Sequence, residues 1–281
     1  ADEKLTFVFS RQEQLNMTVK AHIAVNARKD QLEFRFDILN DTDCYVEYLD
    51  GPEITVPNNF VSDGGNGKLF WPGMEGCEIA DPSQRDSEMS RGFRYQPVSY
   101  PSKGWEGFYP GPAQMQFMAY YSDDAGFYFA AHDPEHHPKA IEYHKTAYGV
   151  RMEYRTFLAI DKHTAYIGNF PFVLKDGVRD WMDAAEIYRE FAESSYSDLP
   201  PKFIDRQNTP DWLKQSPIVL ICPVRGEKDT GQMNPNCYFP YENLIPVVEK
   251  YAEELGTQVM ILLMHWEGTA PWAPPYIWPP Y

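Results

Sequence analysis

The chain has 281 residues, a formal net charge of −16 and an aromatic content of 15%. This acidity makes nucleic acids and anionic membranes poor partners, because both recognise a basic surface. The length fits one large or two ordinary domains, and no apolar stretch of the sequence approaches the roughly 20 residues of a membrane-spanning helix.

Residues 4–172 show mostly the two-residue periodicity of β-strands. Segments 5–9, 17–25 and 31–38 alternate or nearly alternate apolar and polar side chains, and 26–30 has the composition of a hairpin turn. Further strands are predicted at 44–49, 53–56, 114–121, 127–132, 149–157 and 164–170. Many short strands separated by turn residues predict an antiparallel β-sandwich.

Residues 81–112 interrupt this pattern with many Pro, Ser, Gly and Tyr and little periodicity. An irregular segment of this length is more often functional, or draped over a neighbour, than an ordinary connection. Trp71, Trp105 and Tyr109, in and before this segment, either reach over the mouth of a C-terminal barrel or form the lid of the sandwich.

A helical period begins at residue 176. Apolar side chains recur at three- and four-residue spacing from Trp181 to Phe191, and Pro200-Pro201 ends the pattern. We interpret this segment as a linker helix that packs the sandwich against the C-terminal part of the chain.

The C-terminal part contains two short runs that are apolar on both faces, Ile218–Cys222 and Val259–Met264. Such runs are typical of parallel strands covered on both sides. A helical apolar stripe lies between them and ends at Gly256, a plausible C-terminal cap.

This strand-helix-strand order predicts a βαβ unit, and a two-stranded unit cannot bury its own faces. A complete (β/α)8 barrel needs about 250 residues, so we expect a barrel that is truncated after its second strand. The chain is therefore divided into a β-supersandwich over 1–175, a linker helix and connection over 176–209, and the start of a TIM-type α/β barrel over 210–281.

Ligands of βαβ folds bind just past the carboxyl ends of the strands. Arg225 follows the first strand, and His265, Trp266, Glu267 and Trp272 follow the second. A sugar ring would stack on tryptophan while the carboxylate accepts hydroxyl hydrogen bonds. We predict that these five residues bind substrate; the alternative is that His265 and Trp266 close the strand top by packing alone.

A second cluster, residues 132–137, has three imidazoles and two carboxylates within six residues. It suggests either a metal site or a mutarotase-like acid/base pair. Because the spacing is irregular for metal ligands and a polar turn after a strand explains the cluster, we predict no bound metal and no cofactor.

The four cysteines, Cys44, Cys77, Cys222 and Cys237, lack the CxxC spacing of zinc and thioredoxin-like motifs. A Cys44–Cys77 disulfide is one option, and separately buried thiols are the option we favour. The N-terminal Ala-Asp-Glu-Lys suits a mature end left by signal-peptide removal, which predicts a secreted or periplasmic protein, with a trimmed sequence and a cytoplasmic location as the alternative.

Several motifs resemble those of a bacterial glycoside-hydrolase-like family, in which a galactose-mutarotase-like supersandwich precedes a (β/α)8 barrel. The motifs that carry the resemblance are Leu69–Gly76, Tyr109–Ala119, His132-Asp133-Pro134 with Lys139, Trp181–Tyr188 and His265–Pro280. The resemblance implies kinship with α-N-acetylgalactosaminidases and other retaining α-glycosidases.

In such enzymes the nucleophile and the acid/base carboxylate follow later barrel strands than the two found here. The resemblance therefore implies a hydrolase of α-linked glycosides, such as α-galactosides or α-N-acetylgalactosaminides, whose catalytic residues lie outside this chain. Its partners would be a carbohydrate substrate and either the remainder of the barrel or another copy of the chain. Two alternatives stay open: a non-catalytic carbohydrate-binding module, and a sugar epimerase or mutarotase that uses the 132–137 cluster.

Overall fold

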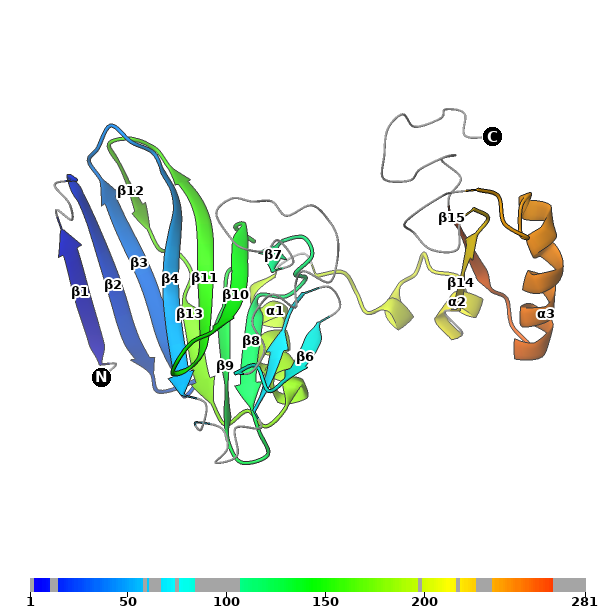
Figure 1. The fold of residues 1–281 in the computed structure, drawn as a ribbon, viewed down its shortest axis with the longest axis horizontal. Helices are drawn as coiled ribbons and strands as arrows, with labels where there is room; N and C mark the ends of the chain where they lie inside the picture. Colours follow the sequence, from blue (N-terminus) through cyan, green and yellow to red (C-terminus); the bar gives the residue numbers. More distant parts are fainter. Residues whose placement is uncertain are drawn as a thin grey trace. The chain divides into compact units, whose positions relative to one another are not determined.

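The computed structural model describes residues 3–10, 15–57, 60, 67–73, 76–83, 107–196, 199–215, 218–225 and 234–264. The chain divides into two compact units, residues 1–198 and 199–281. The first unit is built from antiparallel sheets, and the second contains a two-stranded parallel sheet (Figure 1).

A nine-stranded antiparallel sheet forms the larger layer of the first unit. Its strand order is β1-β2-β3-β13-β9-β8-β5-β6, and β12 also pairs with β3. The strands are β1 Lys4–Ser10, β2 Met17–Asn26, β3 Gln31–Asn40, β5 Lys68–Trp71, β6 Cys77–Ala80, β8 Phe117–Tyr121, β9 Gly126–Ala131, β12 Thr164–Ile167 and β13 Phe172–Asp176. β13 pairs with β3 on one side and with β9 on the other, so it joins two halves of the sheet that are far apart in sequence.

A four-stranded antiparallel sheet forms the second layer, in the order β4-β11-β10-β7. Its strands are β4 Val46–Pro57, β7 Phe108–Tyr109, β10 Lys139–Lys145 and β11 Gly149–Ile160. One apolar core includes side chains of both sheets, among them Ile141, Met152 and Tyr154 from the small sheet and Leu69, Met118, Phe129 and Phe172 from the large one. The first unit is therefore consistent with the predicted β-sandwich.

Strand β4 differs from the sequence prediction, which placed a turn at 50–52 between two separate strands. The structure has one strand with a register shift opposite Glu153 and Arg155 on β11. A β-bulge accommodates the extra residue without ending the pairing. Gly51 takes up the unusual backbone there, with φ of 141°.

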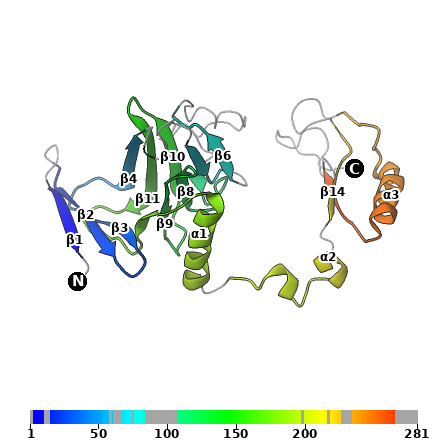
Figure 2. The ribbon, with the colours of Figure 1, turned by 90° about the horizontal axis from the view of Figure 1, so that it is seen from below.

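Helix α1 (Trp181–Ser195) covers the other face of the large sheet (Figure 2). The Asp180 carboxylate accepts hydrogen bonds from the backbone N–H groups of Met182 and Asp183 and so caps the helix. Ala184 of the helix lies in one buried cluster with side chains of β8 and β9. Around β8 and β9 the large sheet thus buries both faces, one against the small sheet and one against α1, whereas β1 is exposed along its whole length.

The second unit has the predicted strand-helix-strand connection. β14 (Val219–Pro223) and β15 (Met260–Met264) pair in parallel, and α3 (Ile245–Leu255) lies between them in sequence. Gly256 caps α3 with φ of 62°, as expected. The unit also has 3₁₀ turns at Phe203–Asp205 and Tyr241–Leu244 and the short helix α2 (Asp211–Gln215). Over the described ranges this sheet has two strands, and no barrel is shown.

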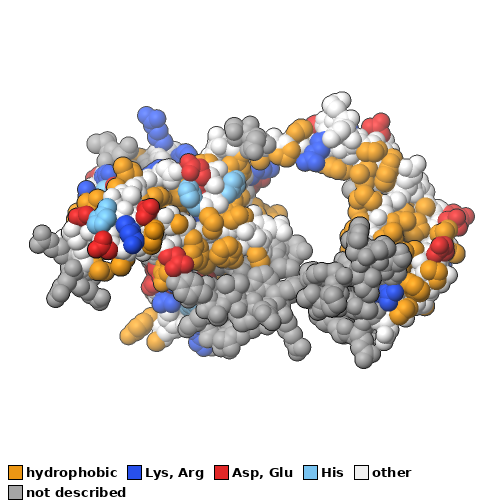
Figure 3. Space-filling view, turned by 90° about the horizontal axis from the view of Figure 1, so that it is seen from above, with side chains coloured by type: hydrophobic (Ala, Val, Ile, Leu, Met, Phe, Trp, Pro, Cys, Tyr) orange, Lys and Arg blue, Asp and Glu red, His pale blue; other side chains and the backbone are white. Residues whose placement is uncertain are grey.

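These two strands are not covered on both sides in the unit as described, as expected of a two-stranded sheet that cannot bury its own faces. Ile221 is 62% exposed and Leu262 is 51% exposed. The unit's buried cluster, over the described part of the chain, consists of Cys222, Val224 and Leu244. A single long helix covers too little area to bury a two-sided apolar sheet, so hydrophobic side chains remain at the surface of this unit (Figure 3).

All four cysteines are free thiols. No disulfide links Cys44 to Cys77, and Cys44 and Cys237 are exposed, which corrects the expectation of separately buried thiols. Cys222 alone of the four is buried, in the cluster of the second unit. Among the helices that the structure describes, none combines the length and apolarity required to cross a membrane.

Candidate functional site

One of the five predicted substrate-binding residues, Arg225, lies within the described residues. It follows β14 and forms an isolated β-bridge with Pro235. Its guanidinium carbon lies 5.0 Å from the centre of the Phe239 ring, so its cation packs on an aromatic face. The other four, His265, Trp266, Glu267 and Trp272, lie outside the described residues. The rim site therefore stays a prediction.

The segment between β9 and β10 is organised by the Asp133 carboxylate. It accepts backbone N–H hydrogen bonds from Glu135 and His137 at 3.0 and 2.8 Å. The Lys139 ammonium donates to it at 2.5 Å and to the His137 carbonyl oxygen at 2.7 Å. Because the side chains of Asp133 and Lys139 are fully buried, they form an internal ion pair that closes a hydrogen-bonded turn.

The electrostatics of this turn keep Asp133 ionised. Burial by itself would raise the pKa of Asp133, but Lys139, His137 and the backbone donors outweigh burial and hold the pKa below its usual 3.8. The three hydrogen bonds, together with His137 Nδ1 at 3.0 Å from Oδ2, take up the acceptor positions of this carboxylate. Asp133 therefore acts in folding rather than as a general base.

The three histidines of the cluster do not converge on one point. His132 stacks on Phe191, His136 lies against Tyr196, and His137 stacks on Phe170. Within the described ranges, the one set of three or more candidate ligand atoms lying within 4.8 Å of one another belongs to Glu142, His144 and Glu153 instead. The geometry thus gives the 132–137 segment neither a metal-ligand set nor an acid/base pair aimed at a common substrate.

Glu142, His144 and Glu153 lie on the outer face of the small sheet. Glu142 is directly opposite Glu153 in the β10–β11 register, an arrangement that destabilises a sheet unless a cation intervenes. His144 Nε2 lies 3.0 Å from Glu153 Oε1 and 3.7 Å from Glu142 Oε2. Hydrogen bonds with Glu142 and Glu153 raise the pKa of His144 to about 9.

His144 therefore carries a positive charge at neutral pH and supplies the cation between the two carboxylates. Arg151 adds a second cation, with its Nε 3.1 Å from Glu153 Oε2. We accordingly assign the group as an ion network that stabilises the pairing of β10 and β11.

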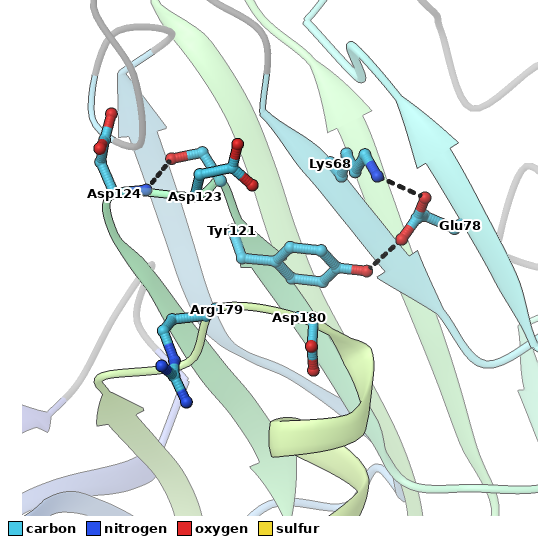
Figure 4. A pocket seen from close by; sticks show the side chains of 8 residues that line it. Lys68, Glu78, Tyr121, Asp123, Asp124, Arg179 and Asp180 are labelled. Carbon is cyan, nitrogen blue, oxygen red and sulfur yellow. Dashed lines mark hydrogen bonds and ion pairs between the residues drawn. The ribbon is translucent and has the colours of Figure 1, made fainter.

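A hollow of about 670 Å³ lies at the other side of the sandwich, where β5, β6 and β8 approach the N-terminus of α1 (Figure 4). Four carboxylates, two cations and two hydroxyl groups line it: Glu78, Asp123, Asp124, Asp180, Lys68, Arg179, Tyr121 and Ser122. Such a mixture of donors and acceptors suits a ligand with many hydroxyl groups, which can donate to carboxylates and accept from ammonium and guanidinium groups.

Glu78 is the central acceptor of this hollow. Its carboxylate accepts a hydrogen bond from the Tyr121 hydroxyl group at 2.7 Å and forms an ion pair with Lys68 Nζ at 2.9 Å. Tyr121 and Lys68 lower the pKa of Glu78, and Glu78 in turn raises the pKa of Lys68. Both groups are therefore charged at neutral pH, and Figure 4 shows the three side chains linked in a row.

Sequence reasoning missed this hollow because its residues come from four separate segments. Each is an ordinary strand or turn residue in its own context. The register brings them together, since Lys68 lies opposite Tyr121 and Glu78 lies opposite Phe70. No local sequence signal marks such a pairing.

The comparisons with known proteins concern this fold. No model of a known protein family matches the chain, and no curated protein matches its sequence. Solved structures of the α-N-acetylgalactosaminidase NagBb from Bifidobacterium bifidum do match. The complex with GalNAc has 11% identity and a TM-score of 0.53, and the match covers 99% of this chain and 45% of that chain. The chain has a glycoside-hydrolase-like fold.

A second NagBb structure, the complex with Gal-NHAc-DNJ, gives the same result. It has 10% identity and a TM-score of 0.53, over 95% of this chain and 43% of that chain. The chain thus spans less than half the length of the enzyme it matches. At this identity the likeness concerns the fold, and it identifies no functional residue.

Proposed function

We propose that this chain is the N-terminal part of a carbohydrate-active glycoside hydrolase that acts on α-linked glycosides. The observation that carries the proposal is the match over 99% and 95% of the chain to two structures of one α-N-acetylgalactosaminidase. An α-galactoside or an α-N-acetylgalactosaminide is the substrate that this likeness favours.

In this proposal the second unit is the opening βαβ of a (β/α)8 barrel. Three observations support it: the parallel register of β14 and β15, the helix α3 between them, and the exposed apolar side chains of both strands. Further strands and helices of the barrel would cover those side chains, and exposed backbone edges of a parallel pair would gain hydrogen bonds. The partner we propose is therefore the remainder of a barrel, with a second copy of the chain as the alternative.

The proposed reaction is hydrolysis through two carboxylates that stand after later barrel strands than β14 and β15. Residues of this chain would then contribute to substrate binding at the rim. Arg225 and the predicted Trp266, Glu267 and Trp272 are the proposed contacts, with the rings stacking on the sugar and the charged groups holding its hydroxyl groups.

The test measures hydrolysis of p-nitrophenyl α-N-acetylgalactosaminide, α-galactoside and their β-anomers by the purified 281-residue chain and by the product of the complete reading frame that contains it. We expect turnover of an α-anomer by the product that includes a full barrel, and none by the 281-residue chain. A complete product that hydrolyses none of these glycosides would overturn the proposal. Turnover by the 281-residue chain that is lost in Glu267→Gln would move catalysis into this chain.

A carbohydrate-binding module without catalysis is the second candidate, and the hollow at Glu78 favours it. The two candidates place the sugar at different residues. Binding of methyl α-N-acetylgalactosaminide, measured by calorimetry, should be lost in Trp266→Ala if the barrel rim is the site and in Glu78→Gln if the hollow is the site. Lys145→Ala, an exposed change on the small sheet, is the control that should leave binding unchanged in both cases.

A further inference from the structure

A second cavity, of about 460 Å³, lies between the β2–β3 turn, β13 and the last turns of α1. Three cations and one carboxylate line it, namely Arg28, Lys29, Lys175 and Glu190. The remaining lining residues are Gln31, His132, Ile187, Phe191 and Ser194. A local excess of positive charge is unexpected on a chain whose net charge is −16, and it makes this cavity a place where an anion is attracted.

His132 forms a rigid wall of the cavity. Its residue is 7% exposed, and its ring stacks on Phe191 with centroids 4.3 Å apart and 9° between the planes. Its Nε2 lies 2.9 Å from the hydroxyl oxygen of Tyr128, which is fully buried. Two contacts from opposite elements, β9 and α1, thus fix the orientation of the ring.

These contacts also fix the position of the proton on His132. A buried hydroxyl group needs an acceptor, and His132 Nε2 is the one that the described residues place beside the Tyr128 hydroxyl. Nε2 therefore accepts, and the proton of the neutral ring is on Nδ1. Burial, followed by the positive charge of Lys29, lowers the pKa of His132 to about 4, so the ring is neutral at pH 7.

The Nδ1–H donor is available to a ligand. No acceptor among the described residues forms a hydrogen bond with this Nδ1. The atom is also absent from the buried polar atoms that lack both a partner and contact with solvent, so solvent reaches it. Since His132 lines the cavity, the donor opens into it. A neutral donor surrounded by cations is the combination with which proteins bind carboxylate, sulfate and phosphate groups.

We propose that this cavity binds an oxyanion, the carboxylate, sulfate or phosphate group of a small molecule. His132 Nδ1–H donates one hydrogen bond, and Arg28, Lys29 and Lys175 supply the positive charge. Lys175 Nζ already donates to the Lys29 carbonyl oxygen at 2.5 Å, which holds the ammonium at the wall and leaves two of its hydrogens for a ligand.

The apolar side of the cavity favours an organic anion over a hydrated inorganic ion. Ile187 and Phe191 offer a surface against which the carbon skeleton of the ligand can pack, as the ring of an acidic sugar would. The proposal does not depend on glycosidase activity, because it concerns binding to the first unit alone.

Binding is expected to be linked to protonation of His132. Lys29 disfavours the protonated form of the His132 ring, and Glu33 favours it. Arg28, Lys175 and Glu190 are the other charged groups that line the cavity. A bound anion shifts this balance toward the protonated ring, so the pKa of His132 rises on binding and affinity increases as the pH falls.

The test is NMR observation of the seven histidine rings of the 281-residue chain at pH 6 and constant ionic strength. Sodium sulfate, glucuronate and sodium chloride are titrated separately. We expect the His132 resonances to shift saturably with an oxyanion and not with chloride, and the midpoint to rise at least tenfold in Lys175→Ala and in Arg28→Ala/Lys29→Ala. Lys20→Ala, an exposed lysine on β2, is the matched control and should change nothing.

Each outcome decides the matter. Saturation by both ligands supports a general oxyanion site, and saturation by glucuronate alone supports an acidic sugar. Saturation by sulfate alone supports an inorganic oxyanion and overturns the argument from Ile187 and Phe191. Shifts that do not saturate, or that Lys20→Ala weakens as much as Lys175→Ala, would overturn the whole proposal. Because Arg28 and Lys29 are exposed on a turn, their double variant keeps the fold intact.

Discussion

Removing the charge of Asp133 is the sharpest test of how the sandwich holds together. Asp133→Asn keeps the side-chain size but leaves the Lys139 ammonium buried without a counter-charge. Breaking a buried ion pair on one side costs about 3–5 kcal/mol. The Lys139 amino group would still donate a hydrogen bond to the His137 carbonyl oxygen, 2.7 Å away. It would also still lie over the rings of Tyr109 and Phe170, whose centres are 5.3 and 5.1 Å away. Burial already lowers the pKa of Lys139 to about 8 against the opposing effect of Asp133, so the variant can release the proton of this amine, and we expect a loss at the lower end of the range, about 3 kcal/mol.

The assay is urea unfolding of the intact chain, with hydrogen exchange of β10 as the local readout, because the chain has two units and one global signal can mix them. Glu135→Gln, an exposed carboxylate of the same turn, is the control and should change the free energy of unfolding by less than about 0.5 kcal/mol. In Asp133→Leu/Lys139→Met both charges are gone, so part of the loss should be recovered. A loss below about 1 kcal/mol in Asp133→Asn, with β10 still protected, would refute the reasoning.

Two further predictions concern the small sheet. The pKa of His144 is raised to about 9, above the 6.5 of an unfolded chain, so its stabilisation is complete below pH 6.5 and is lost as the pH rises through 9. The difference in free energy of unfolding between the wild type and His144→Gln should fall by up to about 3 kcal/mol from pH 6 to pH 10, and a constant difference would contradict the charge network. In Gly149→Ala the new Cβ would lie 1.8 Å from a carbonyl oxygen of β4, so thermal unfolding should show a loss of about 3 kcal/mol or more. Gly177→Ala, with φ of 79° and nothing within 4 Å, should cost only about 1–2 kcal/mol; equal losses in the two variants would show that crowding is not the cause.

The strands that alternate clearly could be predicted from the sequence, whereas the short strands β5, β6 and β7 and the strands β10 and β13 could not. The alternation in segments 17–25 and 31–38 gave β2 and β3 almost to the residue. β10 was missed because it begins with Lys139, a charged residue at a buried position, which hides the periodicity. β13 was missed because five residues ending in Lys175 and Asp176 are too few to distinguish a strand from the approach to a helix.

The arrangement of side chains around the sites was less predictable. The sequence groups His132 with Asp133 as one cluster, yet neighbouring residues at a strand end point to opposite sides. His132 accordingly packs on Phe191 of α1, whereas Asp133 pairs with Lys139. The hollow at Glu78 and the cavity at His132 both depend on strand register and on where α1 lies, and neither is encoded in a local pattern. The rim residues from His265 onward lie outside the described residues and stay a prediction.

The position of β13 imposes an order on synthesis of the protein. β3 leaves the ribosome early, but part of its free edge pairs only with β13, which ends at Asp176. At roughly 5–20 residues per second, the wait is on the order of ten seconds. Until then β1–β3 and the sheet around β8 and β9 are two separate pieces with open edges, and open edges pair with strands of other chains. Nascent chains that stop before Phe172 should therefore be the ones that aggregate, and ribosome pausing just before this strand should lower the yield of folded protein.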